Sequence, residues 1–110
     1  MIQDTLEKIE ARLQNAESLT PDKRAELSTL LATLKQEVAE LHKTNADEAT
    51  SIAGFTELSA HEATRVEKNP VLLQHSLEGL KGSVDGFEES HPRLVQSVNA
   101  ICTTLSNLGI

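Results

Sequence analysis

Apolar side chains recur along this chain at alternating steps of four and three residues, and this spacing limits the fold more than any other feature. The first run consists of Ile2, Leu6, Ile9, Leu13 and Ala16. Steps of four and three place side chains on one face of an α-helix, so the run predicts an amphipathic helix. The later runs are Leu27, Leu31, Leu34, Val38 and Leu41; Leu73, Leu77, Leu80, Val84 and Phe87; and, in phase with the position of His91, Leu94, Val98, Ile101, Leu105 and Leu108. The spacing predicts an all-α helical hairpin or bundle with coiled-coil-like heptad stripes.

Two prolines mark helix starts. Thr20 precedes Pro21 and Asn69 precedes Pro70, which is the order of an N-cap and a first helical residue. We expect a single domain over residues 1–110. Its predicted helices span about 2–18, 21–43, 46–67, 70–90 and 92–108.

The third of these helices has the weakest pattern, because residues 43–69 are rich in Ala, Thr and Ser and include Gly54. Ile52, Phe55 and Val66 fit one helical face. Asn45 and Glu48 have the spacing of a capping box. The segment therefore either continues the preceding helix or restarts near residue 46.

Pro92 interrupts the last run without changing its phase. Either Ser90 caps a new helix that folds back as a hairpin, or one long helix is kinked at Pro92. The unbroken phase favours the kinked helix. Gly109 suits the left-handed position after the last helix, with Ile110 packing back on Leu105.

No charged side chain follows Arg93, although the chain has seventeen Asp and Glu residues. Short uncharged polar groups flank the last stripe, and such groups are buried at lower cost than charges. A chain of this length has too few helices to enclose that helix, so we expect self-association, with a dimer first. The predicted interface consists of Val84, Phe87, Leu94, Val98, Ile101, Leu105 and Leu108.

Composition argues against several classes of function. The net charge is −7, and the ten Lys and Arg form no cluster of four along the sequence, which argues against nucleic-acid binding. The start of the chain lacks the basic and apolar regions of a signal peptide, and no stretch is apolar enough for a membrane span. The single cysteine, Cys102, fits a reducing compartment and a buried thiol. We therefore expect a cytoplasmic protein that does not bind membranes.

Few residues offer catalytic chemistry. Glu88 and His91 have the spacing of the carboxylate–histidine pairs in di-iron bundles. The other interpretation is a structural turn formed by Glu88, Ser90, His91 and Pro92, and we favour it. His61 and Glu62 begin like a zinc-protease motif, but Arg65 stands where the second histidine is needed. We expect no enzyme activity, no metal and no cofactor.

The segment "GFEESHPRLVQSVNAICTTLSNLGI" resembles the C-terminal signature of a bacterial family, domain of unknown function 4404. The matching residues are Phe87, Glu88, Ser90, His91, Pro92, Gly109 and Ile110. Leu108 stands where the family has Met, and residues 43–69 are longer than usual. The resemblance implies a small all-helical protein and assigns no activity.

The expected function is that of a non-enzymatic, self-associating helical scaffold or interaction protein. The alternative is a regulatory adaptor that binds a helix of a partner protein. A metal–carboxylate enzyme built in a helical bundle is the remote alternative.

Overall fold

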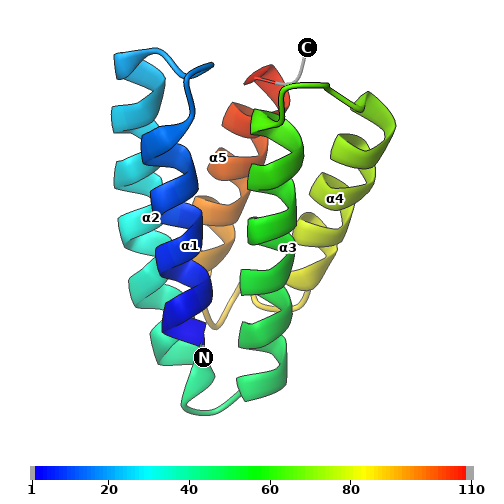
Figure 1. Ribbon diagram of the computed structural model, residues 1–110. Coiled ribbons are helices and arrows are strands. Elements are labelled where there is room, and N and C mark those ends of the chain that lie inside the picture. Colours follow the sequence, from blue (N-terminus) through cyan, green and yellow to red (C-terminus); the bar gives the residue numbers. More distant parts are fainter. Residues whose placement is uncertain (1, 109–110) are drawn as a thin grey trace.

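Five α-helices make up most of residues 2–108, the part of the chain that the computed structural model describes (Figure 1). They are α1 (Ile2–Asn15), α2 (Pro21–His42), α3 (Ala46–Thr64), α4 (Pro70–Ser83) and α5 (Pro92–Leu108). Successive helices run in opposite directions, and no strand occurs among the described residues. The predicted all-α fold is confirmed.

Caps at the starts of α2 and α4 form as predicted. The hydroxyl of Thr20 accepts a hydrogen bond from the backbone N–H of Lys23 at 3.2 Å. The side chain of Asn69 accepts one from the N–H of Leu72 at 3.1 Å. α2 ends at His42 and a new helix begins at Ala46. Asn45 makes no side-chain cap, so the predicted capping box is wrong.

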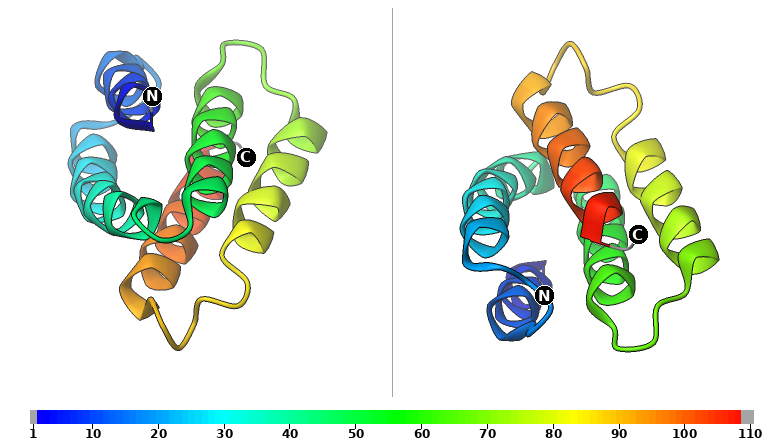
Figure 2. Two further views of the ribbon diagram at one scale, coloured as in Figure 1. Left: turned by 90° about the horizontal axis from the view of Figure 1, so that it is seen from below. Right: turned by 90° about the horizontal axis from the view of Figure 1, so that it is seen from above.

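The helices form two layers. α1, α3 and α4 lie side by side in one layer, and α2 and α5 form the other (Figures 1 and 2). Within the described residues, α3 is the helix that packs against all four others. The segment with the weakest sequence pattern is thus the centre of the fold.

Small side chains explain both that position and the weak pattern. The buried face of α3 includes Ala49, Ala53, Ala60 and Ala63, and small residues let neighbouring helices approach closely. The apolar face predicted for this segment is wrong in part. Ile52 is buried, but Phe55 is exposed and Val66 lies beyond the helix in solvent.

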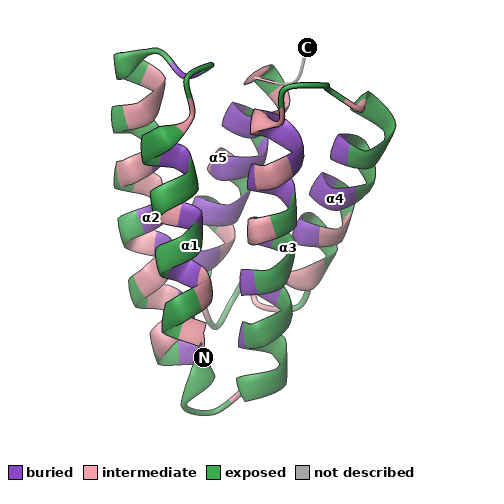
Figure 3. Ribbon diagram, in the orientation of Figure 1, coloured by how far each residue is buried: buried purple, intermediate pink, exposed green. Residues whose placement is uncertain are grey.

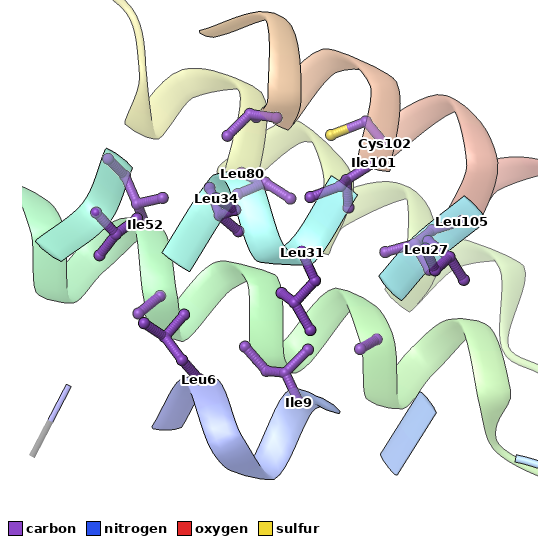
Figure 4. Close-up of a cluster of buried hydrophobic side chains, with 14 of the residues drawn as sticks. Leu6, Ile9, Leu27, Leu31, Leu34, Ile52, Leu80, Ile101, Cys102 and Leu105 are labelled. Atoms are coloured by element: carbon purple, nitrogen blue, oxygen red, sulfur yellow. The ribbon is translucent and has the colours of Figure 1, made fainter. Parts of the chain in front are cut away.

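The other predicted stripes form the core. In Figure 3 the buried residues face the space between the layers, and in Figure 4 large aliphatic side chains from both layers meet there. Leu6 and Ile9 reach this core from α1, and Leu31 and Leu34 reach it from α2. Ile101 and Leu105 belong to the same core and come from α5.

The connection between α4 and α5 is a turn, so the kinked helix is wrong and the hairpin is right. α4 ends at Ser83, well before residue 90, and Gly86 adopts a φ of 95° that favours glycine. Val84 stays buried, and Phe87 packs against the core from the turn itself. A stripe that continues in phase therefore does not require a continuous helix. The prediction for Gly109 and Ile110 lies outside the described residues.

Candidate functional site

The stripe predicted as an interface is already buried inside one chain. Val84, Leu94, Val98, Ile101 and Leu105 are all buried, while Phe87 and Leu108 are partly buried and pack against the core. The cover comes from α2, α3 and α4 of the same chain. The premise that the chain has too few helices to enclose α5 is therefore wrong, and with it the reason for placing an interface on this stripe.

The uncharged flank of α5 divides into two faces. Ser97 and Thr104 are buried, and each finds a hydrogen-bond acceptor: the carbonyl of Arg93 at 2.8 Å and the carboxylate of Glu26 at 3.0 Å, respectively. The other face is exposed and consists of Gln96, Asn99, Thr103 and Asn107. Burial explains why the first face has no charged residue, but it does not explain why the exposed face has none.

Local hydrogen bonds occupy the polar residues of the α4–α5 turn. The carboxylate of Glu88 accepts from the N–H of Gly86 at 2.7 Å, and the hydroxyl of Ser90 lies 2.9 Å from Nδ1 of His91. The rings of Phe87 and His91 meet edge to face, with centroids 5.5 Å apart.

Pro92 is the first residue of α5, and the carbonyl of His91 accepts from the N–H of Val95 at 3.3 Å. His91 therefore occupies the N-cap position that the sequence assigned to Ser90. These contacts favour a structural turn over a pair of metal ligands.

Cys102 lies in the core, with 1% of its surface exposed. Burial raises the pKa of its thiol, and the nearby Lys81 opposes this only in part. The thiol faces the carbonyl of Leu77 with a separation of 4.0 Å. A protonated, buried thiol is a poor nucleophile, and the predicted packing role of Cys102 is confirmed.

Within residues 2–108 no three His, Cys, Asp or Glu side chains gather in a way that could hold a metal ion. Glu62 is buried and forms an ion pair with Arg65, with Nη1 and Oε1 3.0 Å apart. Its neighbour His61 has Nδ1 3.3 Å from Nη1 of Arg12. None of the helices in this part of the chain is long and apolar enough to cross a membrane.

Four large hydrophobic side chains remain exposed on α3 and the start of α4. Phe55, Leu58, Val71 and Leu72 are 37%, 45%, 64% and 44% exposed, respectively. We call these four residues the α3–α4 apolar surface. Such groupings on a small domain commonly mark a contact with another protein.

Phe55 contacts α4 at a glycine. Its ring lies over Gly79, where an added Cβ would be 2.6 Å from Cδ1 and 2.9 Å from Cζ. Leu72 and Gly79 are seven residues apart and share one face of α4, and Leu58 lies one turn after Phe55 on α3. The ring therefore occupies the space that a side chain at position 79 would need.

A second surface feature is an open groove between α1 and the C-terminal end of α3, with a volume of about 810 Å³. Its lining residues are Lys8, Ala11, Arg12, Asn15, Ala16, Glu17, Ser18, Glu57, Thr64, Arg65, Val66 and Lys68. We call this the α1–α3 groove. Figure 1 shows the C-terminal ends of both helices at the same end of the bundle.

The groove gathers positive charge in an acidic protein. Four of the ten Lys and Arg line it, against two of the seventeen Asp and Glu. The ten Lys and Arg form no cluster of four along the sequence, but the fold brings four of them to one groove. Lys8 and Arg12 share a face of α1, whereas Arg65 and Lys68 follow α3 more than fifty residues later. The spacing of Lys8 and Arg12 was visible in the sequence, but the pairing of α1 with α3 was not.

The model of the family described as Domain of unknown function (DUF4404) matches residues 2–110. No curated protein and no solved structure matches the chain at a significant level. The family match spans nearly the whole chain and agrees with the resemblance carried by the Phe87–Pro92 signature. The chain therefore belongs to the DUF4404 family.

Proposed function

We propose that this protein is a non-catalytic helical interaction protein that associates with a second copy of itself through the α3–α4 apolar surface. The observation that carries the proposal is the exposure of Phe55, Leu58, Val71 and Leu72 on two adjacent helices. Isologous pairs related by a two-fold axis are the commonest way for a protein to cover such a surface.

Charge limits how strongly a second copy can associate at this place. Each chain carries a net charge of −7, so two copies repel each other wherever acidic faces meet. Ser51 and His75 lie one turn from Phe55 and Leu72 and carry no acidic group, but the exposed residues Glu48 and Glu78 share helical faces with Phe55 and Val71. Repulsion between these carboxylates therefore weakens the expected dimer.

The size of the surface sets the expected strength. Complete burial of a large apolar side chain contributes about 1.5–3 kcal/mol, and these four are already about half covered. The remaining gain amounts to a few kcal/mol before the cost of association. We therefore expect a reversible dimer that dissociates on dilution.

Sedimentation or light scattering over about 10 μM to 1 mM tests this expectation. The parent should approach twice the chain mass of 12.0 kDa as concentration rises. Leu58→Glu combined with Leu72→Glu should hold the protein at the monomer mass with an unchanged helical signal and melting temperature. Ala32→Glu combined with Val66→Glu adds the same charge at exposed positions outside the surface and should leave the dimer intact.

Two results contradict the proposal. A double variant that keeps the parent's mass profile shows that the surface is wrong. A parent that stays monomeric throughout contradicts self-association and favours the adaptor alternative, in which the same surface receives the apolar face of a partner helix.

A further inference from the structure

We propose that the α1–α3 groove is a binding site for an acidic peptide segment, one that carries closely spaced carboxylate side chains. The site lies between α1 and the end of α3, and it does not depend on self-association. Its volume of about 810 Å³ falls in the range of ligand-binding clefts, and it is open along one side.

The groove has cations that no carboxylate of residues 2–108 neutralises. Lys8 makes no hydrogen bond or ion pair with any described residue. Within residues 2–108, Nη1 of Arg12 lies 3.3 Å from Nδ1 of His61 and pairs with no carboxylate. Unpaired ammonium and guanidinium groups at the edge of a cleft are the groups that recognise carboxylates, and a guanidinium can do so with two parallel hydrogen bonds.

The other two cations, Arg65 and Lys68, already bind groups of the protein itself. Arg65 pairs with the buried carboxylate of Glu62, and the ammonium of Lys68 donates to the carbonyl of Ala63 near the end of α3. Both remain in the lining, where Lys68 adds positive potential and the charge of Arg65 is balanced by Glu62. The direct contacts to a ligand therefore fall to Lys8 and Arg12 on α1.

The charge balance favours a peptide over a nucleic acid. Four cations stand against Glu17, Glu57 and the Glu62 that pairs with Arg65, which leaves the groove with a net charge of +1 in a chain of −7. A nucleic acid carries a phosphate at every nucleotide and extends beyond the groove onto acidic surface. A short peptide can place two carboxylates against Lys8 and Arg12 and its apolar atoms against Ala11 and Val66.

Fluorescence anisotropy with labelled hexaglutamate tests the site, with hexaglutamine as the uncharged probe. The parent should bind hexaglutamate and not hexaglutamine, and the affinity should fall as NaCl rises from about 50 to 500 mM. Lys8→Gln combined with Arg12→Gln should weaken binding about tenfold or more, because two charge-assisted contacts are lost. Lys8→Gln alone should also weaken binding, and it breaks no contact within the described residues.

The matched control is Lys23→Gln combined with Lys43→Gln, which removes the same charge from α2 and the residue after it. It should keep the parent's affinity. An equal loss in both double variants attributes binding to net charge and overturns the site. Absence of hexaglutamate binding overturns it as well, and so does tighter binding of a hexauridylate RNA probe.

Discussion

Gly79 is the residue at which the packing of α3 against α4 depends on a single missing side chain. The Phe55 ring occupies the space that a Cβ would need. Gly54 has the same residue type inside a helix, but nothing lies within 4 Å of a Cβ built there. Substituting Gly54 therefore tests helix propensity alone, whereas substituting Gly79 tests helix propensity together with packing against Phe55.

Gly79→Ala should lower the free energy of unfolding by about 1–2 kcal/mol, because overlap with the ring outweighs the gain in helix propensity. Gly54→Ala should raise it by about 0.5–1 kcal/mol. In a Phe55→Ala background, Gly79→Ala should become stabilising by a similar amount. Urea denaturation of the four variants measures the coupling. A Gly79→Ala protein as stable as Gly54→Ala shows that the ring swings away freely.

The starts of the helices are largely encoded by local sequence, because a cap depends on residues three positions apart. Thr20 and Asn69 satisfy backbone N–H groups as predicted. Asn45 has the right residue type, but its side chain accepts from the hydroxyl of Thr44 at 2.8 Å instead. Residue type alone therefore did not predict that Asn69 caps its helix and Asn45 does not.

Alanine substitutions at the three caps test that difference at the level of helices. Thr20→Ala and Asn69→Ala should each cost about 1 kcal/mol, because each leaves a backbone donor without its partner. Asn45→Ala should cost less than half as much, because no helical N–H depends on it. Thermal and urea unfolding give the values. Equal losses at all three positions contradict the cap geometry.

The ends of helices were harder to predict than their starts. The last stripe keeps its phase through Val84 and Phe87 even though α4 has ended at Ser83, so periodicity alone suggested a longer helix. The left-handed backbone of Gly86 turns the chain after α4 has ended, whereas Gly54 and Gly79 lie inside helices. In α3 the small residues that allow four neighbours to approach also weakened the pattern of large apolar residues.

At the scale of the whole molecule, burial of α5 changes the expected effect of a charge in its stripe. Ile101→Asp should prevent stable folding, because an unpaired carboxylate in the core costs several kcal/mol of a total near 5–15 kcal/mol. Thr103→Asp, two residues away on the exposed face, should leave the melting temperature within a few degrees of the parent. Circular dichroism during heating measures both. Loss of dimer mass with an intact fold in Ile101→Asp would support the original interface instead.

The two surface features could not be read from the sequence, because each depends on which helices are neighbours. Phe55 fitted the apolar face predicted for α3, but in the fold it lies exposed at the boundary with α4. Lys8 and Lys68 are sixty residues apart and meet only because α1 packs on α3. The helices could be predicted because each depends on residues that are close in the sequence. Their arrangement could not be predicted in this way, and the candidate sites depend on the arrangement.

The order in which the helices are synthesised has a consequence for this arrangement. α5 packs against α2, α3 and α4, yet it leaves the ribosome after all three. Until α5 emerges, the leucines of α2 that pack against it are exposed to solvent. The nascent chain then presents hydrophobic surface to chaperones and to other nascent chains. The core is therefore covered only after α5 has left the ribosome.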